Sequence, residues 1–343
     1  MNILILGLGS IGQRHLRNIK KIYPISQIYS IRSKRKKTVP LLNNYNKVIQ
    51  GDIKKKYSII YLNSLAEIKK KKIKINCAFV CTPSSKHIDQ VINLIKLNIP
   101  CFIEKPLGSS LKNVDKLKKL LIKKKLITMM GFQLRFNPII QYLDKVIKKR
   151  SPIGKIITAN IHHGENIKDF HPYEDYKISY AANKKLGGGV ILTQIHEIDY
   201  FLHFFNKYKI EHSSSISSKI TDLKLDVEDI FNASFLLKKN KEKLMCSITL
   251  NFFERPKKRK IFLIGKEGTL EACLNSKKIN LYSKGKKKII KFQFKKNDIF
   301  IKEIKYFMSC VKFNRRIPNE LNIDNGIKTL RFALNLKKDF YSF

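Results

Sequence analysis

Short apolar runs alternate with helix-like segments along the first third of the chain. Runs that are apolar almost throughout predict strands at residues 3–6, 28–31, 77–81, 100–103 and 127–131. Segments with apolar residues at helical spacing lie between several of these runs, notably at 86–97 and 111–124. Strands that alternate with helices form parallel sheets, and such strands are apolar throughout because both faces are buried. The pattern predicts an α/β fold that begins with a doubly wound, Rossmann-type parallel sheet.

The pattern changes after residue 156. One helical segment at about 190–205 is followed by extended runs that turn signals separate: 211–220, 229–237, 244–252, 260–264, 269–273, 279–282 and 289–294. Successive strands of this kind predict a large, mainly antiparallel open sheet. Two helices, at 299–312 and 323–338, close the chain. We expect a dinucleotide-binding domain at 1–131 and an α+β substrate-binding and oligomerisation domain at 132–343, with the last helix packed back on the first domain.

A glycine-rich turn follows the first strand directly and opens a helix. In this G-x-G-x-x-G motif Gly7 permits the tight turn, Gly9 lets a pyrophosphate approach the backbone, and Gly12 lets helix and strand pack closely. The helix start at Ser10 and Ile11 supplies free amides and a positive dipole for an anion. Glycine turns also occur for packing alone, but a strand before and a helix after this one indicate dinucleotide binding.

The residues after the second strand bear on the choice of dinucleotide. In NAD-binding members of the fold, an acidic residue about twenty positions past the glycines accepts the ribose 2′-hydroxyl. Here the strand ends in Arg32, Ser33 and, further on, Arg35, with no acidic residue. These side chains can hold a 2′-phosphate, so NADP(H) is favoured and NAD(H) stays possible. The alternative is one more basic turn in a basic protein.

The next long strand ends in Cys81-Thr82-Pro83, and His87 follows. Ligands of open α/β sheets bind outside the carboxyl ends of the strands, so we expect these residues beside the cofactor. For His87 the alternative is a residue at a helix start with no chemical role.

The net charge of +44 suggests nucleic acid as a partner, but its distribution argues against one. Only eleven of the 70 basic residues are Arg, and the lysines form short runs typical of solvated surfaces, such as 69–72 and 286–288. No apolar run approaches the ~18 residues of a membrane span, and the first strand lacks the basic start of a signal peptide. Six cysteines without paired C-x-x-C spacing fit a reducing compartment. We expect a cytoplasmic protein that binds neither nucleic acid nor membrane.

Further motifs follow one another along the chain: Glu104-Lys105-Pro106 at a strand end, GFQLRFNP at 131–138, Gly187-Gly188-Gly189, and His196-Glu197-Ile198-Asp199. Together with the first glycine turn, Arg14-His15 and Cys81-Thr82-Pro83, this series resembles the Gfo/Idh/MocA oxidoreductase family. Glucose–fructose oxidoreductase and inositol dehydrogenase are representatives of that family. The resemblance covers nearly the whole chain.

This resemblance implies that Lys105 contacts both nicotinamide and the substrate hydroxyl and helps to move the proton. Lysine loses its proton readily when desolvated, which suits acid–base work beside a hydride carrier. Glu104, also assigned to the cofactor site, can hold the orientation of Lys105. The family further suggests a cis peptide before Pro106.

His196 is the second catalytic candidate that the resemblance implies, and it also contacts substrate. Many family dehydrogenases carry an Asp four residues before this His, but here that position is Leu192. This departure argues against simple inositol or glucose dehydrogenase activity. Thr193 lies one helical turn before His196 and can hydrogen-bond a substrate. The alternative for His196 is a satisfied buried histidine.

A long polar and aromatic segment, residues 163–180, precedes the second glycine run and carries His171, Tyr176 and Tyr180. Long loops are often functional, and rings with polar groups suit sugar faces, so we assign these three residues to the substrate. The segment is similar to a subgroup of the family linked to surface amino-sugar and nonulosonic acid pathways. Arg135 either binds a carboxylate or phosphate of the substrate or pairs with an internal acid, and Asn137 joins the candidate substrate ligands.

Asp199 and His203 share a helix face with His196, but ligand sets on one helix are usually coincidental, so we predict no metal site. We predict an NAD(P)-dependent oxidoreductase that transfers hydride between nicotinamide and a hydroxyl or keto carbon of a sugar or nucleotide-linked amino sugar. The alternatives are a redox-neutral NAD-dependent glycosidase, which the family includes, and a non-catalytic NADP-binding sensor. The resemblance also implies a homodimer or homotetramer formed through the C-terminal sheet.

Overall fold

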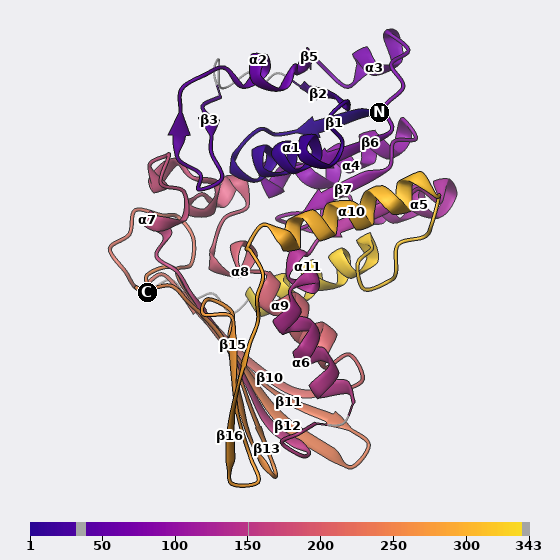
Figure 1. The fold of residues 1–343 in the computed structure, drawn as a ribbon. Coiled ribbons are helices and arrows are strands. Elements are labelled where there is room, and N and C mark those ends of the chain that lie inside the picture. The colour runs from indigo at the N-terminus through magenta and orange to yellow at the C-terminus, as the bar shows by residue number, and fades with distance from the viewer. Residues whose placement is uncertain (32–38, 150, 338–343) are drawn as a thin grey trace.

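The computed structural model describes residues 1–31, 39–149 and 151–337, which form two large sheets with helices between and around them (Figure 1). Arg32, Ser33 and Arg35 lie outside the described residues. The first sheet is parallel and the second is mainly antiparallel, so the predicted fold class is confirmed.

The first sheet has six parallel strands in the order β5-β2-β1-β6-β7-β8. The strands are β1 (Asn2–Leu6), β2 (Gln27–Ile31), β5 (Ile60–Leu62), β6 (Cys77–Val80), β7 (Cys101–Glu104) and β8 (Thr128–Gly131). Five of them match predicted runs. The edge strand β5 was not expected, because only three residues of it pair and its apolar run is short.

Helices cover both faces of this sheet. The connections carry α1 (Ser10–Ile22), the hairpin β3 (Leu41–Leu42) and β4 (Val48–Ile49), α2 (Ile53–Tyr57), α3 (Ala66–Lys70), the 3₁₀ turn η1 (Ser84–Lys86), α4 (His87–Lys96) and α5 (Val114–Lys124). The helix α10 (Asp298–Lys312) returns to pack against α1. There Phe307 meets Phe79 of β6 edge-on, with ring centroids 5.5 Å apart. The last helix, α11 (Ile323–Leu336), contacts β8.

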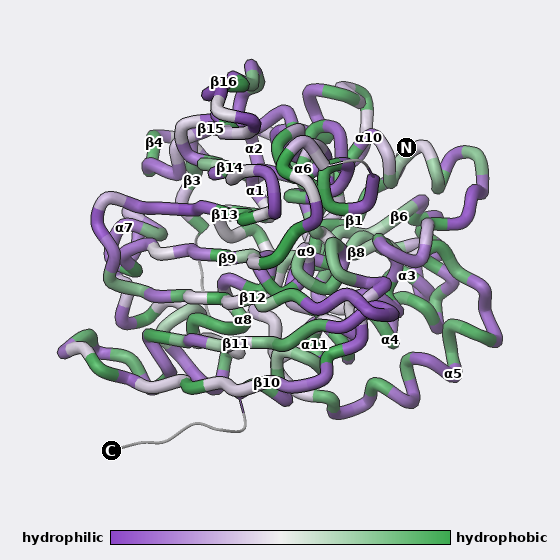
Figure 2. Tube along the Cα trace, turned by 90° about the horizontal axis from the view of Figure 1, so that it is seen from below, coloured by the Kyte–Doolittle hydropathy of each residue, from purple (hydrophilic) through white to green (hydrophobic). Residues whose placement is uncertain are grey.

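The second sheet has eight strands in the order β10-β11-β12-β9-β13-β14-β15-β16, and Figure 2 looks onto it. All neighbours are antiparallel except the parallel pair β12 and β9. The strands are β9 (Ile156–Gly164), β10 (Lys209–Ser218), β11 (Ile230–Lys239), β12 (Glu242–Asn251), β13 (Lys258–Gly265), β14 (Gly268–Cys273), β15 (Lys278–Ser283) and β16 (Lys286–Lys291).

Alternation along these strands separates a buried face from an open one. Ile161 and Phe235 are buried on the inner face, towards α6 (Pro138–Lys148), α8 (Val190–Thr193) and α9 (His196–Phe204). Ile157 and Met245 are about half exposed on the opposite face. Short elements precede α8: η2 (Gln133–Phe136), α7 (Ile167–Phe170), η3 (Tyr176–Ile178), η4 (Tyr180–Ala182) and η5 (Lys184–Leu186). Within the described ranges, no helix is long and apolar enough to cross a membrane.

The single helix expected at 190–205 is interrupted, and that prediction was wrong. The helix α8 ends at Thr193 and α9 begins at His196, although the apolar period continues across the break. The amide of Glu197 donates to the carbonyl of Gln194 at 3.3 Å instead of to that of Thr193. The break therefore leaves the Thr193 carbonyl without its usual helical donor.

Candidate active site

A cavity of about 950 Å³ opens at the carboxyl ends of β1, β6 and β7. Its volume lies at the upper end of the ~300–1,000 Å³ usual for ligand sites. It receives most of the predicted cofactor residues: Gly7, Gly9, Ser10, Ile11, Cys81, Thr82, Pro83, His87, Glu104 and Lys105. It also receives four predicted substrate residues: His171, Tyr180, Thr193 and His196. One cavity thus collects residues from the first sheet and from the helices and loops beside the second.

The three glycines of the first turn have different surroundings. Gly7 adopts φ +93°, and a Cβ there would lie 2.7 Å from the carbonyl oxygen of Cys81. A Cβ on Gly12 would lie 1.9 Å from the carbonyl oxygen of Gly7, so this glycine packs helix against strand and lies outside the cavity. Among the described residues, nothing lies within 4 Å of a Cβ added to Gly9. The space that Gly9 leaves open faces the cavity, as a site for close approach of a pyrophosphate requires.

His87 joins the two loops that follow β6 and β7. Its Nε2 lies 2.6 Å from the carbonyl oxygen of Thr82, and its Nδ1 lies 2.8 Å from that of Pro106. Burial lowers the pKa of His87, although both carbonyls favour its protonated form. His87 is the first residue of α4, which agrees with the alternative of a residue at a helix start. Its ring also holds the loop of Thr82 against the loop of Lys105.

Glu104 is anchored from the helix that follows the glycine turn. The Nε2–H of His15 donates to Oε1 of Glu104 at 2.6 Å, and both side chains are buried. The backbone amide of Lys105 donates to the other carboxylate oxygen at 3.3 Å. Glu104 therefore fixes the start of the Lys105 loop, and the peptide between Lys105 and Pro106 is cis.

The amine of Lys105 points across the cavity to the break between α8 and α9. Its Nζ donates to the Thr193 carbonyl at 2.6 Å, the carbonyl that the helix break releases. Burial lowers the pKa of Lys105 to about 8; the charge of Glu104 opposes this shift and that of Arg259 adds to it. About a tenth of this amine is therefore neutral at pH 7, whereas less than about a thousandth of a solvated lysine is.

His196 is buried in the cavity wall, and neither of its ring nitrogens has a hydrogen-bond partner in the part of the chain that the structure describes. The hydroxyl of Thr193 is likewise buried and unpaired. Burial, and then the positive charges of Lys105 and Arg259, hold the pKa of His196 well below its ordinary value. A buried polar group without a partner is costly, so these atoms are available for a ligand. The alternative of a satisfied core histidine does not describe His196.

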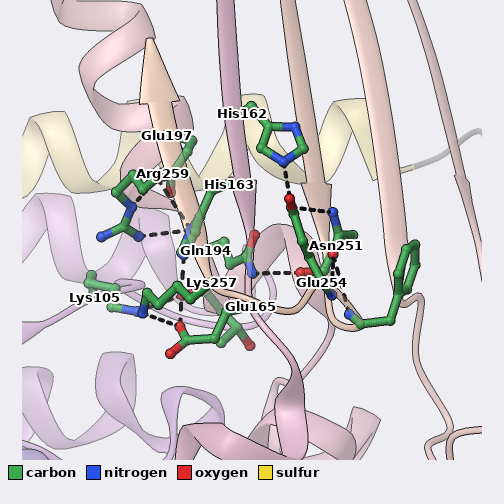
Figure 3. A network of polar contacts seen from close by, with 12 residues as sticks. Lys105, His162, His163, Glu165, Gln194, Glu197, Asn251, Glu254, Lys257 and Arg259 are labelled. Atoms are coloured by element: carbon green, nitrogen blue, oxygen red, sulfur yellow. Dashed lines mark hydrogen bonds and ion pairs between the residues drawn. The ribbon is translucent and has the colours of Figure 1, made fainter. Parts of the chain in front are cut away.

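A charged network from the second sheet faces Lys105, and the sequence did not reveal it (Figure 3). Arg259 of β13 pairs through Nε with Glu197 at 2.7 Å and donates through Nη2 to Nδ1 of His163 at 2.8 Å. Glu165 accepts from Lys257, which comes directly before β13. Burial opposes the ionisation of Glu197, yet the charge of Arg259 holds the pKa of that carboxyl below its usual range. In the sequence Lys257 and Arg259 are hidden in a basic run, and only the strand order brings them to the cavity.

Three predicted substrate residues lie away from the cavity. Arg135 is buried and pairs with Asp199, with Nε and Nη2 at 2.6 and 2.9 Å from the carboxylate oxygens. This is the internal pair that the sequence left as one alternative. Asn137 caps α6 by accepting from the amide of Ile139 at 2.8 Å. The Tyr176 hydroxyl accepts from the amide of Lys224 at 3.1 Å.

The role of Arg135 can be tested through Arg135→Met. This change leaves the buried Asp199 carboxylate without its cation, so we expect a loss of ~3 kcal/mol in the free energy of unfolding. Urea unfolding measures that loss. The KM for substrate of the folded fraction stays at the wild-type value, whereas a large rise in KM with unchanged stability would return Arg135 to the substrate site.

The side chains of α9 that could suggest a metal site, Asp199 and His203, have other partners. The Asp199 carboxylate forms an ion pair with Arg135. Nε2 of His203 lies 3.0 Å from Oδ1 of Asp144 and 3.1 Å from Nζ of Lys148. In the part of the chain that the structure describes, no group of three or more His, Cys, Asp or Glu side chains is placed to hold a metal ion.

The class of protein follows from the glycine turn, the parallel sheet and the match of residues 1–132 to the Gfo/Idh/MocA family, described as an oxidoreductase family with an NAD-binding Rossmann fold. This match places the N-terminal part of the chain in that family. It confirms the resemblance drawn from the motifs for this part of the chain.

Among solved structures, the fold is similar to that of UDP-N-acetylglucosamine 3-dehydrogenase GnnA from Acidithiobacillus ferrooxidans. The TM-score is 0.74 at 15% identity, over 99% of this chain and 97% of the other. It is also similar to the WlbA dehydrogenase from Bordetella pertussis, solved with NADH and UDP-GlcNAcA. There the TM-score is 0.74 at 14% identity, over 98% and 95% of the two chains. At these identities the likeness concerns the fold.

Among curated relatives, 4-carboxy-2-hydroxymuconate-6-semialdehyde dehydrogenase from a Sphingobium species is 24% identical over 147 residues. That alignment covers 43% of each chain. The chain spans about half the length of the curated relatives that it matches.

Proposed function

We propose that the protein is an NAD(P)-dependent oxidoreductase that transfers hydride between nicotinamide and a hydroxyl or keto carbon of a sugar or nucleotide-linked amino sugar. One observation carries this proposal: a buried amine, Lys105, lies in the same cavity as an open glycine turn and opposite a buried, unpartnered His196. Reduction of NAD⁺ or NADP⁺ by a carbohydrate alcohol, followed by the absorbance of the reduced nicotinamide, tests it.

The residues around the glycine turn fit a dinucleotide. The described residues leave the space above Gly9 open, and no side chain among them caps the start of α1, where the backbone of Ser10 hydrogen-bonds Tyr173. A helix start of this kind suits the pyrophosphate of a dinucleotide. The dinucleotide, when bound, supplies the hydride acceptor or donor. Thr82, Pro83 and Glu104 line the same cavity and would lie along it.

A preference for NADP(H) over NAD(H) belongs to this proposal. It is supported by the sequence after β2, where Arg32 and Ser33 stand and no acid is found. The ratio of kcat/KM for NADP⁺ and NAD⁺, measured in the wild type and in Arg32→Ala, tests the preference. A wild-type enzyme that favours NAD⁺ would overturn it.

The chain's own residues handle the proton that accompanies the hydride. In alcohol oxidation, the neutral amine of Lys105 takes the hydroxyl proton while Thr193 holds the amine in place. His196 is neutral and orients the same hydroxyl through one ring nitrogen. In carbonyl reduction Lys105 returns the proton. Because these groups are fixed before the reaction, little reorganisation is needed in the transition state.

The pKa of Lys105 predicts the pH dependence of both directions. Oxidation needs the unprotonated amine, so kcat/KM for the alcohol rises with pH and levels off above about 8. Reduction needs the protonated amine, so kcat/KM for the ketone falls as pH rises through the same value. Initial rates across the neutral and alkaline range measure both limbs. Two limbs that rise together with pH would contradict the assignment of Lys105.

Oligomer and location also remain proposals. The open face of the second sheet, with Ile157 and Met245 exposed, supports a homodimer or homotetramer formed through this sheet. Light scattering of the purified protein measures the subunit number. Six free cysteines support a reducing, cytoplasmic compartment.

A further inference from the structure

Three cations line one wall of the cavity, and the hydride mechanism uses none of them. They are Arg14 of α1, Lys257 directly before β13, and Lys296 two residues before α10. We refer to them as the cation cluster. Together with Glu165, which accepts from Lys257, they carry a formal surplus of two positive charges.

Arg14 is held in place without an acid. Its guanidinium carbon lies 4.8 Å from the centre of the Phe300 ring, and Phe300 also lines the cavity. In the described part of the chain, Arg14 has neither an ion pair nor a hydrogen bond. A guanidinium that is stacked and unpaired is oriented in advance for a planar or tetrahedral oxyanion.

Lys296 is the second cation without an acidic partner among the described residues. Burial and the positive charges of Lys257 and Arg14 together lower its pKa to about 8. Lys296 is therefore close enough to Lys257 and to Arg14 to be repelled by both. An anion placed among them would relieve that repulsion.

Glu165 connects the cluster to the reacting end of the cavity. Glu165 accepts from Lys257, and its charge also acts on the amine of Lys105. Lys257 comes from the second sheet, whereas Arg14 lies on α1 and Lys296 lies beside it, where the neighbouring Asn297 hydrogen-bonds Asn18 of α1. Through Lys257 and Glu165 the cluster reaches the end of the cavity where Lys105 lies, and we therefore assign it to a group on the substrate.

We propose that Arg14, Lys257 and Lys296 bind an oxyanion group of the substrate, a carboxylate or a phosphate, so that the enzyme acts on an acidic sugar in preference to its neutral counterpart. This inference rests on the proposed function and narrows its substrate class. The surplus of two charges suits a group that carries one or two negative charges.

The experiment compares probes that share a ring and differ in charge. Glucuronate, glucose 6-phosphate and glucose are titrated into the complex of the full-length protein with NADH, and the fluorescence of the bound nicotinamide reports binding without turnover. We expect glucuronate or glucose 6-phosphate to bind at least about tenfold more tightly than glucose, the size of one charge-assisted hydrogen bond. Which of the two binds more tightly separates a carboxylate site from a phosphate site.

Single substitutions test whether Lys257 and Lys296 bind the anionic group of the probe. Lys296→Met and Lys257→Met should each weaken binding of the anionic probe about tenfold and leave the affinity for NADH unchanged. The matched controls Lys295→Met and Lys258→Met remove neighbouring lysines that do not line the cavity, and they should change neither affinity. Thermal unfolding shows whether each variant is folded.

Three results would overturn the inference. Equal binding of glucuronate, glucose 6-phosphate and glucose by the NADH complex shows that no anion site exists, and it leaves the proposed function intact. A parallel loss of NADH affinity in Lys296→Met and Lys257→Met assigns the cluster to the cofactor phosphates. A wild-type protein that binds neither NADH nor NADPH overturns the proposed function and this inference together.

Discussion

Replacing Lys105 by Ala should lower kcat by a factor of about 10²–10⁴, the usual contribution of a general acid–base group. The amine is buried, donates to the Thr193 carbonyl at 2.6 Å and has a pKa of about 8, so it can both accept and return a proton. His196 cannot replace it, because its pKa lies well below the ordinary value and its ring remains neutral. Initial rates at saturating substrate measure the loss.

Lys105→Arg is the sharper companion variant. Arginine keeps the positive charge but does not release its proton in proteins, so it should be nearly as inactive as Lys105→Ala. The affinity for NADH, measured by fluorescence, should stay within a few-fold of the wild type in both variants. An Arg variant with substantial activity would show that the charge of Lys105 matters and that its proton does not.

Replacing Gly12 by Ala should cost ~3 kcal/mol or more in the free energy of unfolding, at the upper end of the range for overpacked sites. The new Cβ would lie 1.9 Å from the carbonyl oxygen of Gly7, so α1 must move away from β1. The atom that the new Cβ meets belongs to the backbone of Gly7, which cannot move aside as the end of a flexible side chain can. Urea unfolding, or failure to recover folded protein, measures the effect.

Gly9→Ala is the matched control in the same turn. Gly9 has φ −71° and open space around an added Cβ, so the change should cost less than ~1 kcal/mol in stability. Its effect should fall on the cofactor, because the Cβ fills the space through which a pyrophosphate approaches. Equal losses of stability in the two variants, with wild-type NADH affinity in Gly9→Ala, would contradict the roles given to these glycines.

The fold could largely be predicted from local patterns. Residues 3–6 of β1 are apolar because both faces of the strand are buried there, and the glycines after the strand mark a sharp turn into α1. Lys105 is predicted as a catalytic residue because it follows a buried strand near that turn and belongs to the Glu104-Lys105-Pro106 motif of the family. These signals lie within a few consecutive residues, where sequence is informative.

The opposite wall of the cavity could not be predicted. His163, Glu197 and Arg259 come from β9, α9 and β13, and only the order of strands in the second sheet brings them together. Lys257 and Lys296 resemble the many solvated lysines of this chain. Arg135 was ambiguous for the same reason, since its partner Asp199 is 64 residues away.

Hydride transfer itself provides the most direct test of the proposed function. Purified protein is incubated with NAD⁺ or NADP⁺ and a panel of neutral sugars, sugar acids and nucleotide sugars, and the absorbance of the reduced nicotinamide is recorded. We expect the absorbance to rise with at least one carbohydrate alcohol and to stay unchanged with Lys105→Ala. Sugar release without any change in absorbance, or an equal rise with Lys105→Ala, would contradict it.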